Sequence, residues 1–153
     1  MTPEPRWLRP DEMRAWRAYV IGSELLRQRL SRELQESEGI ALPDYEVLVR
    51  LSECEGWQMR MSHLAGQVAS SKSRLSHQIS RMEKLGLVKR VECADDARGV
   101  IAELTQKGMD TLRAAAPTHV EGVRAHLVDL MTPEEQEVVA CIFERVIEHL
   151  DQG

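Results

Sequence analysis

Apolar residues recur at approximately helical spacing near both ends of the chain. Between Asp11 and Ser37 they alternate with arginine and glutamate, which predicts one long amphipathic helix. A second apolar stripe, over residues 139–150, follows Thr132-Pro133-Glu134-Glu135, a capping box with proline in the first helical turn. The pattern therefore predicts a helix near each end of the chain.

The middle of the chain is divided into shorter helices. Leu42-Pro43-Asp44 predicts the start of a helix that continues through Leu51 and ends at Gly56. A helix of roughly two turns follows Ser62. After the short turn 69–71, the hydroxyl of Ser71 can cap another helix, whose buried stripe is Leu75, Ile79, Met82 and Leu85 and whose end is Gly86.

Beyond Gly86 the pattern changes from helical to β-prone. Residues 87–91 and 100–104 flank a polar link, which predicts a β-hairpin with a longer loop than the tight two-residue kind. Thr105 can cap a fifth helix from about Gln106 toward Leu130, and Pro117 is expected to kink or interrupt it. The expected fold is mainly α with a small β-hairpin wing.

These elements predict one unit over residues 1–153 with two functional regions. Residues 43–104 form a winged helix-turn-helix module for DNA binding, because a helix, a short turn, a second helix and a hairpin can place one helix in a major groove. Residues 10–38 and 105–151 form N- and C-terminal helices that serve as a dimerisation region.

The charge distribution supports a polyanionic partner. The whole chain has a formal net charge of −5, yet residues 60–90 contain seven lysines and arginines and one acid, Glu83. A chain that is acidic overall thus contains one cationic segment, which is the face that double-stranded DNA would find attractive.

The expected DNA-binding residues lie on the helix after Ser71 and on the hairpin. Small serines at a helix start let its N-terminus approach a phosphate, arginine suits guanine, and glutamine suits adenine. Lysine and arginine at the start of the hairpin can reach flanking phosphates. The predicted set is Ser71, Lys72, Ser73, Arg74, His77, Gln78, Arg81, Lys89 and Arg90.

The tip of the hairpin carries Asp96-Ala97-Arg98-Gly99. Glycine allows a sharp turn, and one projecting arginine can enter a narrow, electronegative minor groove. Asp96 is placed to hold that guanidinium by a charge-assisted hydrogen bond. We therefore add Asp96 and Arg98 to the predicted DNA-binding residues.

The segment from Ser62 to Gly108 resembles the MarR family of regulators. The resemblance rests on Leu64-Ala65, on Ser71-Lys72-Ser73, on residues 85–90, on Asp96-x-Arg98-Gly99 and on Leu104-Thr105-x-x-Gly108. It implies a homodimeric, ligand-responsive repressor of a pseudo-palindromic operator, with interlocked terminal helices. It also implies sensing of small phenolic or other aromatic acids, oxidants or metals.

The terminal helices supply the expected dimer and effector residues. The predicted dimer interface is Trp16, Val139, Ile142, Phe143, Val146 and Leu150, because these apolar residues are distant in sequence from the DNA-reading core. Trp16, Tyr19 and Tyr45 are the weaker prediction for an aromatic effector, since aromatic residues at helical spacing are more often core.

Other functional classes find little support in the sequence. Three cysteines without CxxC spacing, and five histidines without HxH or HExxH spacing, give no reason to expect a metal site or another cofactor. Catalytic motifs, a membrane span and an export signal are also not found, so we expect a cytoplasmic protein that is not an enzyme. Cys93 could still be a reactive thiol. The alternative to DNA binding is a winged-helix module that docks an acidic protein partner. A third hypothesis is an enzyme that binds a small molecule in the helical part of the chain.

Overall fold

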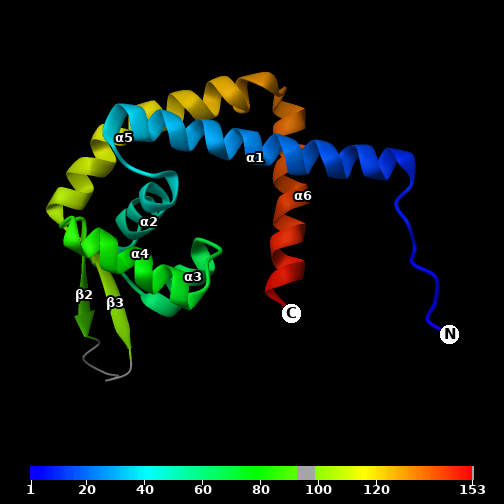
Figure 1. Cartoon of the computed structure of the whole chain (residues 1–153). Coiled ribbons are helices and arrows are strands. Elements are labelled where there is room, and N and C mark those ends of the chain that lie inside the picture. The colour runs from blue at the N-terminus through cyan, green and yellow to red at the C-terminus, as the bar shows by residue number, and fades with distance from the viewer. Residues whose placement is uncertain (93–98, 153) are drawn as a thin grey trace. The chain divides into compact units, whose positions relative to one another are not determined.

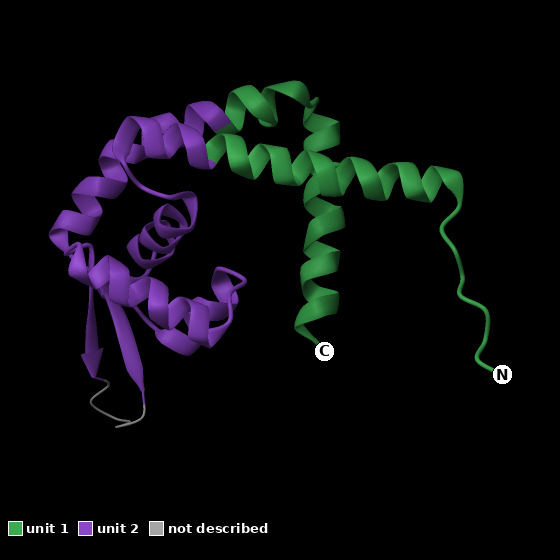
Figure 2. Ribbon diagram, viewed as in Figure 1, with its two compact units in different colours: residues 1–30, 123–153 green, residues 31–122 purple. Residues whose placement is uncertain are grey.

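The computed structural model describes residues 1–92 and 99–152 (Figure 1). It divides into two compact units, which Figure 2 distinguishes by colour. The central unit comprises residues 31–122, and the terminal unit comprises residues 1–30 and 123–153. Two helices, α1 (Pro10–Glu38) and α5 (Gln106–His126), run from one unit into the other.

The central unit is a helical module with a small sheet. Its complete helices are α2 (Leu42–Ser52), α3 (Met61–Gln67) and α4 (Lys72–Lys84). The antiparallel sheet has the order β1-β3-β2, with β1 at Gln58–Arg60, β2 at Val88–Glu92 and β3 at Val100–Leu104. Fully buried side chains from every one of these helices, among them Leu48, Leu64 and Ile79, form its core. The prediction of a mainly α fold with a hairpin wing is confirmed.

Three features of the secondary structure differ from the sequence-based expectations. Strand β1 was not predicted; it pairs with β3, placing Met59 opposite Ala102. Helix α2 ends at Ser52, and Gly56 lies beyond it in a short 3₁₀ turn, where its φ of 67° suits glycine. Helix α5 continues through Pro117, and a second 3₁₀ turn, Val128–Leu130, follows its end at His126.

Both turns that flank α4 follow the same helix-ending geometry. After α3, the amide of Ser70 donates to the carbonyl of Ala65, and Ala69 has a left-handed backbone with φ of 50°. After α4, the amide of Leu87 donates to the carbonyl of Met82, and Gly86 has φ of 77°. This Schellman arrangement satisfies the last carbonyls of each helix and sets the direction of the chain into and out of α4.

The turn that links α4 to β2, the end of β3 and the start of α5 meet at Gly108. A β-carbon at this position would collide with the carbonyl oxygen of Leu87, and would lie 2.6 Å from Leu104 Cδ1. Thr105 joins the same elements, because its hydroxyl lies 2.6 Å from the carbonyl oxygen of Gly86 and 3.0 Å from that of Leu87. The motifs 85–88 and Leu104-Thr105-x-x-Gly108 are therefore two sides of one close backbone contact.

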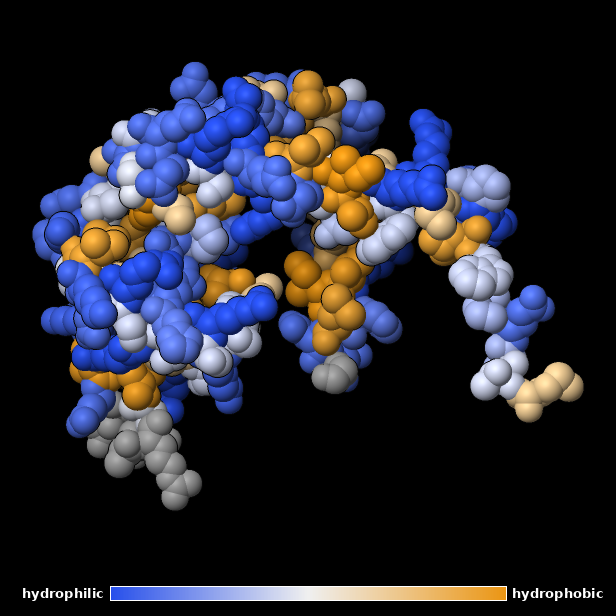
Figure 3. Space-filling view, viewed as in Figure 1, coloured by the Kyte–Doolittle hydropathy of each residue, from blue (hydrophilic) through white to orange (hydrophobic). Residues whose placement is uncertain are grey.

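The terminal unit contains the first part of α1 and helix α6 (Pro133–Asp151). The predicted capping box of α6 is present: Thr132 Oγ1 accepts from the amide of Glu135, whose carboxylate accepts from the amide of Thr132. None of the helix's residues is buried. Its apolar side chains instead gather along an exposed surface (Figure 3).

Candidate nucleic-acid interface

Helix α4 begins at the predicted cap. Ser71 has an extended backbone, and its hydroxyl oxygen accepts a 3.2 Å hydrogen bond from the amide of Arg74. Lys72, Ser73 and Arg74 are exposed around this first turn. Free amides at a helix start favour an anion, so the first turn of α4 is suited to a DNA phosphate.

The outward face of α4 lies opposite the core stripe Leu75, Ile79 and Met82, as the sequence predicted. The prediction that Leu85 completes this stripe is wrong, because Leu85 lies just beyond the end of α4 and is 53% exposed. Arg74 and His77 are exposed on this face. Within the described parts of the chain, neither side chain has a hydrogen bond or an ion pair. Both can therefore turn toward a ligand without breaking an internal contact.

Two other predicted contacts, Gln78 and Arg81, are held from one flank of α4 by Asp44 of α2. Gln78 Nε2 donates to Asp44 Oδ1 at 2.9 Å, and Arg81 Nη2 donates to the same oxygen at 2.8 Å. Asp44 is 6% exposed, whereas the Arg81 side chain is 59% exposed. The carboxylate is thus inside the fold, while most of the guanidinium it holds remains outside.

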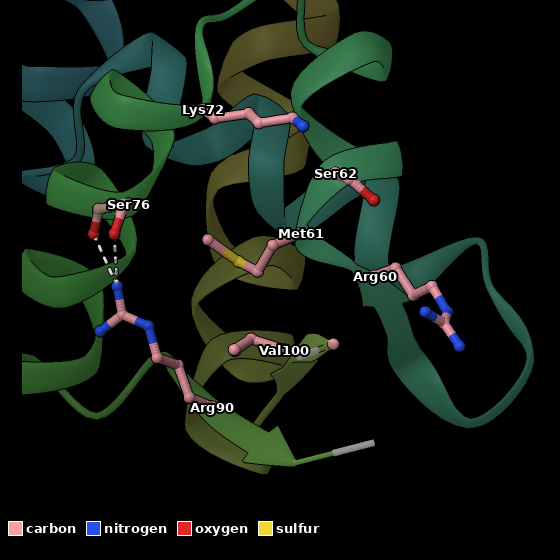
Figure 4. Close-up of a pocket in the computed structure, with 8 residues that line it drawn as sticks. Arg60, Met61, Ser62, Lys72, Ser76, Arg90 and Val100 are labelled. Atoms are coloured by element: carbon pink, nitrogen blue, oxygen red, sulfur yellow. Dashed lines mark hydrogen bonds between the residues drawn. The ribbon is translucent and has the colours of Figure 1, made fainter. Parts of the chain in front are cut away.

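Arg90 of β2 holds the other flank of α4. Its Nη2 lies 2.7 Å from the carbonyl oxygen of Ser76 and 3.2 Å from Ser76 Oγ (Figure 4). Its Nη1 donates to Ser80 Oγ at 3.0 Å and lies 3.4 Å from a carboxylate oxygen of Glu83. Arg90, which the sequence predicted to contact a DNA phosphate, is therefore already bound to α4. Its guanidinium also pairs with Glu83, the one acid among residues 60–90.

Lys89 lies beside Arg90 but is bound more loosely. It faces Glu103 across the β2–β3 pair, with Nζ 3.3 Å from Glu103 Oε1. The lysine side chain is 57% exposed. An exposed pair of this kind contributes little to stability, so Lys89 can exchange this partner for a phosphate.

An open hollow of about 300 Å³ borders the wing side of α4 (Figure 4). Its lining includes three cations, Arg60, Lys72 and Arg90, together with Ser62 and Ser76. Figure 4 shows Lys72 reaching across from α4 toward α3, above Met61 and Val100. The hollow extends the cationic surface from α4 to the base of the wing.

The tip of the wing lies outside the described residues. Asp96 and Arg98, as well as Cys93, belong to this stretch, so their placement remains a prediction. The two strands that carry them, β2 and β3, are paired in register from Val88 opposite Leu104 to Glu92 opposite Val100.

The aromatic residues predicted for an effector fall into both units. In the terminal unit, the Trp16 and Tyr19 ring centroids are 6.0 Å apart, and Tyr19 is 5.2 Å from Phe143. Tyr45 belongs to the central unit, where it is 5% exposed and its ring centroid lies 4.6 Å from that of His119. Burial raises the pKa of Tyr45 and lowers that of His119, although the charge of Glu46 opposes the shift of the histidine.

The predicted dimer residues are all exposed in the single chain. On α6 the exposed fractions range from 36% for Val139 and Phe143 to 68% for Leu150, and Trp16 on α1 is 55% exposed. Ile142, Val146 and Leu150 also line a shallow hollow with Arg145 and His149. The structure therefore leaves an apolar surface on α6 open to solvent.

Other kinds of site are not apparent in the part of the chain that the structure describes. There, no group of three or more acidic, histidine or cysteine side chains is arranged to hold a metal ion. Cys54 and Cys141 are free thiols. Among the described helices, none is both long and apolar enough to cross a membrane.

Sequence reasoning missed Asp44 as a member of this interface. Its position in Leu42-Pro43-Asp44 indicated only a helix start. Its partners Gln78 and Arg81 are 34 and 37 residues away, so nothing in the local pattern joins them. An aspartate in a first helical turn is common on account of the helix dipole, which hides any second role.

Comparison with known proteins identifies the chain as a relative of bacterial regulators. A family model described as transcriptional regulator SarA/Rot matches residues 29–114. The transcriptional regulator HosA of Escherichia coli O127:H6 is 30% identical over 115 residues, which are 75% of this chain and 83% of HosA.

Two solved structures from Streptomyces coelicolor extend the match to nearly the whole chain. AbsC, a MarR family transcriptional regulator, is 46% identical with a TM-score of 0.92, covering 97% of this chain and 100% of AbsC. Sco3205, a MarR family regulator solved in complex with DNA, is 41% identical with a TM-score of 0.92, covering 97% and 93%. These relatives are regulators and not enzymes, as the sequence predicted. The chain belongs to the MarR family of winged helix-turn-helix transcriptional regulators.

Proposed function

We propose that the chain binds a pseudo-palindromic operator as a homodimer and represses transcription until a small aromatic or phenolic acid releases it. Helix α4 enters the major groove, the tip of the wing with Asp96 and Arg98 reaches the minor groove, and Lys72 and Lys89 contact flanking phosphates. The protein then acts in the cytoplasm, where bacterial DNA lies.

The observation that carries this proposal is the exposed face of α4. The helix presents a capped N-terminus, the side chains of Arg74 and His77, which have no hydrogen bond or ion pair among residues 1–92 and 99–152, and the outer part of Arg81. Its one acid, Glu83, is paired with Arg90. A helix face with this charge and this free hydrogen-bonding capacity suits the edges of base pairs between two phosphate rows. The DNA complex of Sco3205, at 41% identity, supports the same use of the fold.

The exposed apolar surface of α6 supports a homodimer. Val139, Ile142, Phe143, Val146 and Leu150 lie on one helix and are all at least 36% exposed. Contiguous exposed apolar side chains usually mark an interface, and a second copy would cover them by two-fold symmetry. Two α4 helices related in this way would read half-sites about 10 base pairs apart.

The repressor and effector parts of the proposal follow from this arrangement and from the family. A dimer spread over two half-sites occupies DNA that a polymerase would need. The exposed aromatic cluster of Trp16, Tyr19 and Phe143 offers ring faces to an aromatic acid in the terminal unit. Tyr45 is buried, so it would affect binding of the effector only indirectly, through the packing of the core of the central unit.

Selection of bound sequences from a random duplex pool tests the operator. We expect enrichment of an inverted repeat whose affinity falls steeply as salt rises. A thermal-shift screen of aromatic acids, followed by operator release, tests the effector. Weak and uniform affinity for every duplex, together with an acidic protein that co-purifies, would instead favour the protein-docking alternative.

A further inference from the structure

We propose that Asp44 is a specificity-determining residue that acts through the DNA-reading helix without touching DNA. Its carboxylate fixes the side chains of Gln78 and Arg81 before DNA arrives. This inference rests on the proposed use of α4 in DNA binding, and it assigns a role to a residue of α2.

The geometry of the carboxylate makes it a fixed anchor. Asp44 is the one buried polar or charged residue in the described part of the chain, and a single oxygen, Oδ1, accepts from both partners. A buried carboxylate is tolerated only when charged or polar donors satisfy it. Gln78 and Arg81 therefore stabilise Asp44, and Asp44 in return restricts their conformations.

For Gln78 the anchor fixes which way the amide points. A carboxylate can only accept hydrogen bonds, so the amide must turn its Nε2 toward Asp44. Gln78 Oε1 is left as the acceptor that faces away from the carboxylate. An outward acceptor selects bases that present an amino group in the major groove, which are adenine and cytosine.

For Arg81 the anchor fixes one end of a planar group. One nitrogen, Nη2, is bound to Asp44, while the side chain remains 59% exposed. A guanidinium has five N–H donors, so most are left for an external acceptor. A planar fork held at one end loses little freedom on binding and is aimed in one direction. An unanchored arginine could instead contact whichever phosphate is nearest.

Arg74 provides an internal comparison on the same helix. It is exposed, and its guanidinium has no hydrogen bond or ion pair within the described residues. Arg74 and Arg81 therefore differ in whether a buried acid holds them, and not in charge or in the helix that carries them.

The test compares base preference in Asp44→Asn and wild-type protein by selection from random duplexes and by titration. Asparagine keeps the size of the side chain but removes the charge that holds Arg81, and its own amide can flip. We expect the ratio of affinities for selected and scrambled duplexes to fall about tenfold or more, the effect of one good base contact. The lost preference is expected at discrete positions in each half-site, with affinity for scrambled DNA unchanged or higher.

The matched control is Glu53→Gln, which removes one acid just after the same helix. Glu53 is 61% exposed and pairs only loosely with Arg50, at 3.6 Å. Its variant should keep the wild-type preference. If Asp44→Asn keeps it too, or loses affinity uniformly for all duplexes, Asp44 has no role in specificity and the inference is overturned. If the wild-type protein selects no sequence, the proposed function itself fails.

A measurement on the wild-type protein covers the case in which Asp44→Asn does not fold. In the DNA-free protein, nuclear magnetic resonance can follow rotation of each arginine guanidinium. We expect the Arg81 group to rotate more slowly than that of Arg74. Equal rotation of the two groups would show that Asp44 does not preset Arg81 and would overturn the inference.

Discussion

Arg90 on β2 donates a 2.7 Å hydrogen bond from its guanidinium to the main-chain carbonyl oxygen of Ser76, in the first half of α4. The same group also bonds Ser80 Oγ at 3.0 Å and is 29% exposed. The wing is thereby fastened directly to the helix that is proposed to read DNA. Because one charged group donates several hydrogen bonds, Arg90 contributes to the stability of the fold as well as to the positive charge of this surface.

We predict that Arg90→Met lowers the free energy of unfolding by about 1–3 kcal/mol, because it removes charge-assisted hydrogen bonds from a largely covered site. Urea denaturation measures the change. Lys89→Met is the control, since its exposed pair with Glu103 should contribute within about 0.5 kcal/mol. Equal losses in the two variants would contradict the fastening role of Arg90.

Gly108 leads to a prediction about backbone contact. Gly108→Ala should destabilise the protein by about 2 kcal/mol or more, because its β-carbon would collide with the main-chain carbonyl of Leu87. A main-chain carbonyl cannot move aside as the end of a flexible side chain can. Gly66→Ala in α3 is the matched control. A β-carbon there meets nothing within 4 Å, so the same change should be neutral or stabilising by up to about 1 kcal/mol.

Ala69 leads to a prediction of opposite sign. Its φ of 50° is unfavourable for a residue with a β-carbon, so Ala69→Gly should raise the free energy of unfolding by about 1 kcal/mol. Ala114→Gly makes the same chemical change at an exposed helical position of α5 and should lower it by about 1 kcal/mol. Two changes of the same sign would indicate that the turn at Ala69 carries no strain.

His119 predicts a dependence of stability on pH. Burial lowers its pKa below the usual 6.5, and in the described structure its Nδ1 has no hydrogen-bond partner. As pH falls below 6.5, the unfolded chain binds a proton that the folded protein resists, so stability decreases until the lowered pKa is reached. His119→Phe should therefore show a smaller loss of stability than wild type over about pH 7 to pH 5. Equal slopes in chemical denaturation at several pH values would contradict this account.

The apolar surface of α6 predicts the effect of one charge on assembly. Ile142→Glu should shift the proposed dimer to monomer in light scattering, because a carboxylate would have to be buried against the second copy. Ile142→Leu keeps the apolar surface and should remain dimeric. An intact dimer in Ile142→Glu protein would remove this part of α6 from the interface.

Most of the fold could be predicted because its signals are local. Apolar spacing located the helices, and Ser71 and Thr132 located two of their starts, with the expected cap bonds present. Strand β1 was missed because three residues are too few to show an alternating pattern. For α5 the sequence left open whether Pro117 kinks or interrupts the helix; the helix is not interrupted, because packing can hold it together across a proline that disfavours it.

The site was harder to predict than the fold. The sequence indicated which side chains are cationic and which face of α4 they share, but not their internal partners. Arg90 and Arg81 are both arginines next to a predicted DNA surface, yet one is bound to α4 and the other to α2. Such pairings join residues far apart in the chain, so they depend on how the elements pack and not on spacing.

The close contact at Gly108 also has a mechanical consequence. The main chain of α5 lies against the main-chain carbonyl of Leu87 there, and the Leu104 side chain packs beside the contact. The Thr105 hydroxyl donates to the same Leu87 carbonyl oxygen and also lies within hydrogen-bond distance of that of Gly86. The first turn of α5 and the residues that enter β2 are thus joined by direct contacts to the main chain, so the position of the wing's base depends on that of α5.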